Sequence, residues 1–358
     1  MRPDEIRIID RDAVTRHLSE LDPVAVVEST VLGHVQGHFD LPAEGYMTWT
    51  NGAGAYTRSI AMLGAVRQRD EWTYGIKLIN ASVSNPQVGM ERAGGFTVLF
   101  DPETARPSTL VEAGYVSALR TAAYTMSTLR TIGPSEFTGV SLLGCGTVAR
   151  MHVKLLSRYF PSVDEIHVHD IRADRASAFS AEITADLPEL RVIVHDGPQE
   201  CLAATDVLVT TTVSARPYVQ PGWLSPDGFV AHVSLDDITA DVFLDAAAIY
   251  VDDLDLVRDN PRRILGDMMR SGQVMSPDHA SAPPTGPGRA LTGIYGEVLD
   301  GRREAIRPGR GVVVSNPFGM SILDIAMCHA IAQRAEEAGL GTCVDLLGPR
   351  TRAALTEH

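Results

Sequence analysis

Residues 138–172 read TGVSLLGCGTVARMHVKLLSRYFPSVDEIHVHDIR, and they carry the strongest structural signal in the chain. An apolar strand is predicted over 138–143, and it runs directly into a G-x-G-x-x-A turn over 144–149. Apolar side chains then recur every three or four positions, which predicts a helix. A second apolar strand over 165–169 ends at Asp170. This order of strand, glycine turn, helix, strand and acidic residue is typical of a βαβ unit that binds a dinucleotide.

Each part of this turn has a physical role in dinucleotide binding. Gly144 allows the chain to turn sharply out of the strand, and Gly146 leaves space for the pyrophosphate. Asp170 can accept hydrogen bonds from ribose hydroxyls and would repel a 2′-phosphate, which predicts NAD rather than NADP. Arg172 opposes this preference, because a guanidinium can pair with a 2′-phosphate. The first residues of the following helix, whose unpaired N–H groups can bind phosphate, are Thr147 and Val148.

Length and composition limit the class of protein. A chain of 358 residues predicts two domains, because single hydrophobic cores rarely grow beyond about 250–300 residues. The net charge of −14 and the lack of a basic run argue against nucleic acid or an anionic membrane as partner. No apolar run approaches the roughly 18 residues of a membrane span, and the N-terminus lacks the apolar core of a signal peptide. The 4 scattered cysteines show no metal-binding spacing, so we expect a cytoplasmic protein without a structural metal.

The order of the predicted elements gives the fold class. Beyond the second strand, strands and helices continue to alternate, which predicts an α/β domain with a Rossmann-type doubly wound parallel sheet. Gly133 and Pro134 end a long helix, and we place the domain boundary there. The NAD-binding domain is therefore expected over residues 134–314. Residues 1–133, with 315–358 returning to them, are expected to form an α+β domain.

Polar residues follow several strands of the predicted parallel sheet, where ligands bind. One strand ends in a run of threonines over 210–212. Another is followed by Ser234, Asp236 and Asp237. On pattern alone, two aspartates at a strand end are first a helix N-cap and only second a catalytic pair.

The N-terminal part contains three cations in unusual settings. Lys77 interrupts an apolar strand predicted over 74–79, where a lysine is more often on the solvated face. Arg92 follows Glu91 in a loop, where a surface ion pair is the simpler interpretation. Arg120 lies among small residues of a predicted helix, so its guanidinium cannot simply lie in water unless that face is exposed.

Five strings occur in an order that is more specific than any of them alone: the strand with Lys77, the ERAGG loop, the ALRTAA helix, the GCGTVA turn and the NPFG turn. In this order the chain resembles the ornithine cyclodeaminase/μ-crystallin family over about residues 70–335. GIKLINASVSNP, MERAGG, LFDPET, HVSLDDI, YVDDLD and NPFGMSILDI are most similar to family members that cleave N-(2-amino-2-carboxyethyl)-L-glutamate. The resemblance implies a homodimer whose N-terminal domain, joined by the final helix, binds an amino acid substrate and forms the dimer interface.

The resemblance also implies roles for individual residues. Lys77 matches a lysine that contacts the substrate carboxylate, and Arg120 matches an arginine that reaches the cofactor phosphates. Asp237 matches the acid/base aspartate, with the adjacent Asp236 as the alternative. Asn316 is first a turn residue and second a wall of the nicotinamide pocket. The remaining candidate cofactor contacts are Asp170, Thr211, Thr212 and Ser234.

One stretch departs from the family pattern. Relatives usually carry an arginine for the substrate carboxylate where this chain reads Gly45 to Trp49, and Thr48 stands in its place. Arg58 or Arg92 can supply the missing positive charge, since a guanidinium suits a carboxylate especially well. The sequence leaves both arginines open.

The activity that the resemblance implies is removal of hydride from the α-carbon of an amino acid by NAD, followed by hydrolysis of the imine. The substrate would be N-(2-amino-2-carboxyethyl)-L-glutamate and the products 2,3-diaminopropionate and 2-oxoglutarate, for siderophore or antibiotic biosynthesis. One alternative is an ornithine or lysine cyclodeaminase, which returns the hydride and releases ammonia. A ketimine (imine) reductase is another, and a nucleotide-binding crystallin-like protein without catalysis is the third.

Overall fold

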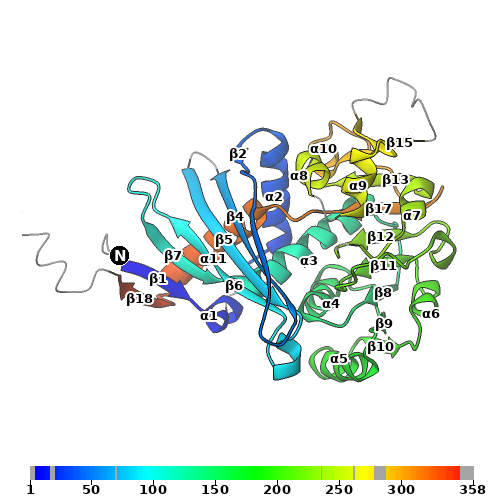
Figure 1. The fold of residues 1–358 in the computed structure, drawn as a ribbon, viewed down its shortest axis with the longest axis horizontal. Helices are drawn as coiled ribbons and strands as arrows, with labels where there is room; N and C mark the ends of the chain where they lie inside the picture. The colour runs from blue at the N-terminus through cyan, green and yellow to red at the C-terminus, as the bar shows by residue number, and fades with distance from the viewer. Residues whose placement is uncertain are drawn as a thin grey trace, which may run out of the picture. The chain divides into compact units, whose positions relative to one another are not determined.

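In the computed structural model the chain divides into two compact units, Met1–Arg120 with Met320–His358, and Thr121–Gly319. Each unit contains its own sheet, and the division falls within the helix α3 (Figure 1). The structure describes residues 5–16, 21–68, 71–234, 236–260, 263–277 and 288–346.

The elements of the first unit come from both ends of the chain. They are β1 (Glu5–Ile9), α1 (Arg11–Arg16), α2 (Pro23–Val35), β2 (Phe39–Asp40), β3 (Gly45–Thr50), β4 (Tyr56–Gln68), β5 (Glu71–Ser82), the 3₁₀ turn η1 (Asn85–Val88), β6 (Ala93–Phe100), β7 (Pro107–Glu112), the start of α3 (Ala113–Ile132), α11 (Ser321–Glu337) and β18 (Thr342–Asp345).

The sheet of the first unit is built on an antiparallel meander. Strands β4, β5, β6 and β7 pair in sequence order, β1 adds in parallel to β7, and β18 closes that edge antiparallel to β1. Helix α11 packs closely on one face, because Gly64 has no Cβ: an added one would lie 2.8 Å from Oγ of Ser321. Met62 and Lys77 face each other across β4 and β5 on this helix-covered face. We call the opposite face of the sheet the outer face.

The second unit alternates strands with helices, as the sequence predicts. Its elements after α3 are β8 (Gly139–Leu143), α4 (Thr147–Tyr159), β9 (Glu165–His169), α5 (Ala173–Asp186), β10 (Arg191–Val194), α6 (Pro198–Ala203), β11 (Val207–Thr210), η2 (Pro221–Trp223), β12 (Phe229–His232), α7 (Ala240–Asp245), β13 (Ala248–Val251), α8 (Leu254–Asp259), α9 (Ile264–Arg270), β14 (Val274–Met275), β15 (Arg289–Ala290), β16 (Gly293–Ile294), α10 (Tyr295–Leu299) and β17 (Val313–Asn316).

The main sheet of this unit has the strand order β10-β9-β8-β11-β12-β17-β13-β16, and all of these pairs are parallel. Helix α4 lies on one side of it, with α6 and α7 on the other (Figure 1). Strands β11, β12 and β13 are buried at every residue, as expected for a parallel sheet covered on both faces. The predicted doubly wound α/β fold is therefore confirmed, and its strand ends lie along one edge.

Two local predictions need correction. The residue pattern over 254–271 predicts a single helix, but in the structure this stretch is interrupted and forms α8 and α9. Asn260 is extended (φ −76°, ψ 115°), because a residue before proline avoids the helical conformation. Residues 37–60 are rich in Gly, Pro, Thr and Asn, which predicts loops and edge strands, and the long strand β4 was therefore missed. Helices of the described residues contain no apolar stretch long enough to cross a bilayer.

Candidate functional site

The glycine turn has the geometry that a pyrophosphate requires. Gly144 follows β8 with φ +90°, and a Cβ there would lie 3.0 Å from the carbonyl carbon of Thr211, so a larger residue does not fit. Gly146 is the N-cap of α4 and has no side chain to cap it. No side chain caps the N-terminus of α4, which begins at Thr147 and Val148, and the positive end of a helix dipole attracts an anion. These residues fit the diphosphate of NAD.

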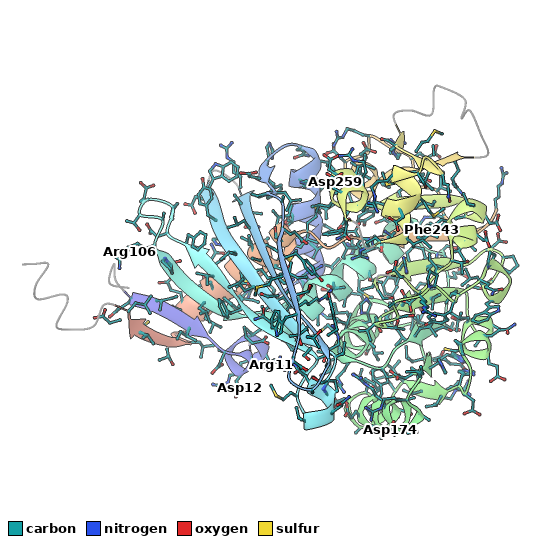
Figure 2. All side chains as sticks on the ribbon, viewed as in Figure 1. Arg11, Asp12, Arg106, Asp174, Phe243 and Asp259 are labelled. Atoms are coloured by element: carbon teal, nitrogen blue, oxygen red, sulfur yellow. The ribbon has the colours of Figure 1, made fainter. Side chains whose placement is uncertain are left out.

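Asp170 directly follows β9 and braces this turn. Its Oδ2 accepts a hydrogen bond from the backbone N–H of Cys145 at 2.9 Å, and its Oδ1 accepts one from the N–H of Arg172 at 3.0 Å. Each carboxylate oxygen keeps a further lone pair for a ribose hydroxyl. The guanidinium of Arg172 pairs instead with Asp174, with Nε 3.2 Å from Oδ1. Asp174 lies at the start of α5 (Figure 2). Arg172, the residue that could pair with a 2′-phosphate, is thus paired with Asp174.

The two candidate threonines after β11 have different tasks. The hydroxyl of Thr211 donates to the carbonyl oxygens of Leu143 and Gly144 at 3.0 and 2.9 Å, so it stabilises the start of the glycine turn. The hydroxyl of Thr212 donates to Oδ1 of Asp237. One threonine therefore shapes the phosphate site, and the other belongs to the site of the acid/base candidate.

Asp237 is fully buried, and hydroxyl groups surround its carboxylate. Besides Thr212, Ser234 donates to Oδ2 and the hydroxyl of Tyr218 also binds the carboxylate. Burial raises the pKa of Asp237, although these hydrogen bonds oppose the shift. Tyr218 was not predicted, because no sequence motif marks it. It is held there by the carbonyl oxygen of Asp237, which accepts the N–H of Tyr218 at 2.9 Å.

Asp236 lies beside it in the chain but faces a different element. Its Oδ1 accepts the backbone N–H of Ile264 at 3.0 Å, so it caps the first turn of α9. The helix-cap interpretation of the aspartate pair thus holds for Asp236, on a helix well downstream. The carboxylate of Asp237 is the one that lies among hydroxyls at the strand ends.

Asn316 is the last residue of β17 and is fully buried. The sequence predicts a strand over 311–314, and the observed strand ends two residues later. Its Oδ1 lies 2.6 Å from Nδ1 of His232. The turn that follows is pinned by Asp252, whose two oxygens accept the N–H groups of Phe318 and Gly319, both at 2.7 Å. The YVDDLD string was noted as a motif, but its role in holding this turn required the fold.

Lys77 is buried in the first unit and is not on a solvated face. Its Nζ donates to Oγ of Ser117 at 2.9 Å and forms an ion pair with Oδ1 of Asp324, also at 2.9 Å. Oδ2 of Asp324 pairs with Nε of Arg120 at 3.1 Å. Burial lowers the pKa of Lys77, and the charge of Asp324 opposes that shift. Lys77, Arg120 and Asp324, here called the cation cluster, place two cations against one carboxylate.

Asp324 was missed by the sequence analysis. The only available signal was one acid inside the apolar run SILDIAM of α11, where it is 1% exposed. A buried acid on a helix needs a partner, and here it has two.

The structure separates the two arginines proposed to replace the family's carboxylate-binding arginine. Arg58 on β4 is the direct cross-strand neighbour of Thr48 on β3, and its Nη1 donates to the hydroxyl of Tyr46 at 3.1 Å. Side chains alternate between the two faces along a strand, so Arg58 and Met62 lie on the same face of β4. This is also the face of Lys77, which pairs with Met62 across the strands. Arg92 precedes β6, and its neighbour Glu91 forms an ion pair with Arg11 at 2.6 Å.

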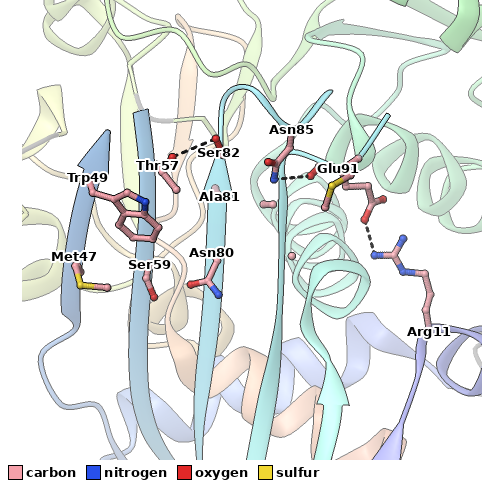
Figure 3. A pocket seen from close by; sticks show the side chains of 13 residues that line it. Arg11, Met47, Trp49, Thr57, Ser59, Asn80, Ala81, Ser82, Asn85 and Glu91 are labelled. Carbon is pink, nitrogen blue, oxygen red and sulfur yellow. Dashed lines mark hydrogen bonds and ion pairs between the residues drawn. The ribbon is translucent and has the colours of Figure 1, made fainter. Parts of the chain in front are cut away.

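A cavity of about 860 Å³ opens on the outer face of the first sheet, and neither Lys77 nor Arg58 lines it. Figure 3 shows Met47 and Trp49 on β3 beside Ser59 on β4, with the Arg11–Glu91 ion pair at one edge. This cavity is therefore distinct from the cation cluster.

A doubly wound parallel sheet with a glycine turn, an acid after the second strand and polar strand ends defines a dinucleotide-binding protein. The sequence matches the model of the ornithine cyclodeaminase/mu-crystallin family over residues 7–339, and the chain belongs to this family. The resemblance predicted from the sequence is confirmed.

Three known proteins illustrate the similarity. The crystal structure of CmnK is 48% identical, covers 97% of this chain and all of that chain, and has a TM-score of 0.89. The N-((2S)-2-amino-2-carboxyethyl)-L-glutamate dehydrogenase of Staphylococcus aureus is 24% identical over 90% of this chain and 93% of its own length. An archaeal alanine dehydrogenase dimer with bound NAD shares the fold, with 20% identity over 96% of this chain and 99% of that chain, and a TM-score of 0.77.

Proposed function

We propose that this chain is an NAD-dependent amino acid dehydrogenase that oxidises a C–N bond. Its substrate would be N-(2-amino-2-carboxyethyl)-L-glutamate, and its products 2,3-diaminopropionate and 2-oxoglutarate, in the biosynthesis of a siderophore or an antibiotic. The observation that supports an anionic substrate is the cation cluster, in which Lys77 and Arg120 both pair with the carboxylate of Asp324. The similarity to the Staphylococcus aureus dehydrogenase supports this particular substrate.

The excess positive charge of the cluster suits an anion. A desolvated cation binds a carboxylate more strongly than a solvated one, because the interaction is less screened. Lys77 would hold the α-carboxylate, and Arg120 would serve the cofactor phosphates.

Arg58 is the better candidate for a second carboxylate contact. It stands directly opposite Thr48, so a guanidinium on β4 can serve the position that an arginine on β3 would serve. Its contact with Tyr46 gives it a defined direction. Arg92 remains the alternative.

The chemistry requires a base and a hydride acceptor. NAD accepts the hydride from the α-carbon when it is bound. Asp237 takes up the proton that the substrate amine loses, so that the nitrogen lone pair can form the C=N bond. Because its carboxylate is fully buried, the proton would reach it through the hydroxyl of Tyr218 or Thr212. Water then adds to the imine carbon, and the C–N bond breaks to give the 2-oxo acid and the diamino acid.

One assay tests this function. The protein is incubated with NAD and N-(2-amino-2-carboxyethyl)-L-glutamate while NADH absorbance and ammonia are followed. Stoichiometric NADH with 2-oxoglutarate and without ammonia is the expected result. Ammonia from ornithine or lysine without net NADH would indicate a cyclodeaminase, and NADH consumption with a cyclic imine would indicate a reductase. Tight NAD binding with no turnover of any of these compounds would contradict an enzymatic role.

We also infer that the outer face of the first sheet is the surface of a homodimer. Exposed apolar side chains line this face from β3 to β5, and Met47 is 61% exposed; the others are Trp49, Leu63, Trp72 and Tyr74. Such a contiguous patch is unusual on a monomer. Light scattering should show a dimer that Leu63→Glu dissociates. Val194→Glu, which places the same charge on an exposed residue of β10, should leave it intact.

A further inference from the structure

The donor and acceptor roles around His232 follow from its two neighbours. The backbone N–H of Asp237 donates to Nε2 of His232 at 3.2 Å. A backbone N–H is only a donor, so Nε2 carries the lone pair and the neutral ring must hold its proton on Nδ1. Nδ1 lies 2.6 Å from the side-chain oxygen of Asn316, and it therefore donates to that oxygen.

This contact fixes which way the amide of Asn316 points. Its oxygen is turned to His232, so its NH₂ group must point elsewhere. Asn316 is 1% exposed, and Nδ2 has no hydrogen-bond partner among the residues that the structure describes. Leaving a buried donor unpaired is energetically costly, and native proteins rarely tolerate it.

The position of Asn316 indicates what completes this hydrogen bond. It ends β17, between the ends of β12 and β13, at the edge of the parallel sheet where ligands bind. On β12, the neighbouring strand, His232 is the last residue and Asp237 follows shortly. An oriented donor beside the acid/base candidate suits a carbonyl oxygen of the reacting end of a ligand.

We propose that His232 is a positioning residue that orients Asn316, so that Nδ2 of Asn316 donates to the carboxamide oxygen of nicotinamide. This inference rests on the proposed function, because it assumes that a nicotinamide cofactor binds at these strand ends. His232 also accepts a hydrogen bond from the backbone N–H of Asp237, so its ring links Asn316 to the loop that carries the proposed base.

The surroundings of His232 keep its ring neutral. It is fully buried, Phe243 packs edge-on against it with ring centroids 5.9 Å apart, and burial lowers the pKa of His232 to about 4. The charge of Arg263 lowers it further. A protonated ring would direct a second N–H at the N–H of Asp237, which the observed geometry does not allow.

The test compares ligands with and without the nicotinamide ring. In Asn316→Asp the side chain still accepts from His232, but an oxygen replaces the donor. Calorimetry should show NAD bound at least about tenfold more weakly than by the unchanged protein, with the affinity for ADP-ribose unchanged. In His232→Phe the amide is released rather than removed, so a smaller loss confined to NAD is expected. Circular dichroism melting confirms that each variant folds.

A third measurement needs no variant. Thionicotinamide adenine dinucleotide carries sulfur, a poor hydrogen-bond acceptor, in place of the carboxamide oxygen. The unchanged protein should bind it several-fold more weakly than NAD, and Asn316→Asp should lose this discrimination.

Two results would overturn the inference. Equal weakening of NAD and ADP-ribose by Asn316→Asp would mean that Asn316 acts on the nucleotide half or on folding. Equal affinity of the unchanged protein for NAD and its thio analogue would mean that no donor reaches the carboxamide. If the unchanged protein binds neither NAD nor ADP-ribose, the proposed function itself fails, and this outcome is separate from the first two.

Discussion

The cation cluster of the first unit and the Asp237 site of the second unit bury charge in opposite ways. Lys77 and Arg120 both pair with the carboxylate of Asp324, and the charge of Glu44 also acts on Lys77. In the part of the chain that the structure describes, the side-chain donors to Asp237 are neutral hydroxyls, among them those of Thr212, Ser234 and Tyr218. A buried charge needs either a partner or several hydrogen bonds. The first arrangement brings two cations to one carboxylate, and the second leaves a carboxylate that exchanges a proton easily.

The largest expected effect comes from removing the proton acceptor. Asp237→Asn should lower kcat by about 10²–10⁴, because an amide of nearly the same shape still hydrogen-bonds to hydroxyl groups but cannot take up a proton. Stopped-flow NADH absorbance measures the rate, and calorimetry should find NAD binding unchanged. Asp236→Asn is the matched control, since its carboxylate caps α9. A fast Asp237→Asn with a slow Asp236→Asn would reverse the assignment.

Removing the counter-charge of the cation cluster should mainly affect stability. Asp324→Asn leaves two cations close together without a carboxylate, and we expect a loss of about 3–5 kcal/mol in the free energy of unfolding. Urea denaturation provides the measurement. Asp174→Asn breaks an exposed ion pair with Arg172 and should change nothing measurable. Equal stability of the two variants would mean that the cluster is not an electrostatic unit.

A change at the glycine turn should lower the affinity for NAD rather than the rate of the reaction. Asp170→Ala removes the carboxylate that accepts the N–H of Cys145 and braces the glycine turn, and it should weaken NAD by about 10- to 100-fold. Fluorescence titration with NADH and ADP-ribose should show the same loss for both ligands, because the ribose of adenosine is common to them. A loss of affinity for NADH alone would mean that Asp170 acts on the nicotinamide half of the cofactor, and this would contradict its assignment to the ribose of adenosine.

The smallest predicted effect is on the pH profile, and the two sites shift it in opposite directions. Asp237 must be ionised to act as a base, and burial raises its pKa, so kcat/KM should rise with pH at a higher pH than an ordinary carboxyl group gives. Lys77 must be charged to hold a carboxylate, and burial lowers its pKa. As the pH rises, activity should therefore be lost at a lower pH than an ordinary lysine would give. Lys77→Arg should move only the alkaline limb upward, because a guanidinium stays charged. An unchanged alkaline limb would contradict the role of Lys77.

Local signals in the sequence were sufficient for the dinucleotide half of the site. Gly144, Gly146 and Asp170 lie within one strand–turn–helix–strand unit, so their spacing alone predicts how they meet. The structure shows them joined through the turn, with Asp170 bound to the N–H of Cys145. The weaker predictions were those that depended on long strands, and β4 was missed because its polar and apolar residues do not alternate regularly.

By itself, the sequence determined the fold class, the family and the position of the glycine turn, because these depend on residues close together in the chain. Only the tertiary structure decided that Asp324 is the partner of Lys77, that Asp236 caps α9, and that His232 hydrogen-bonds to Asn316. These partners lie far apart in the sequence, and no local pattern records which strand ends and helix faces meet. Burial, which sets the pKa of Lys77 and Asp237, likewise exists only once the sheets have packed.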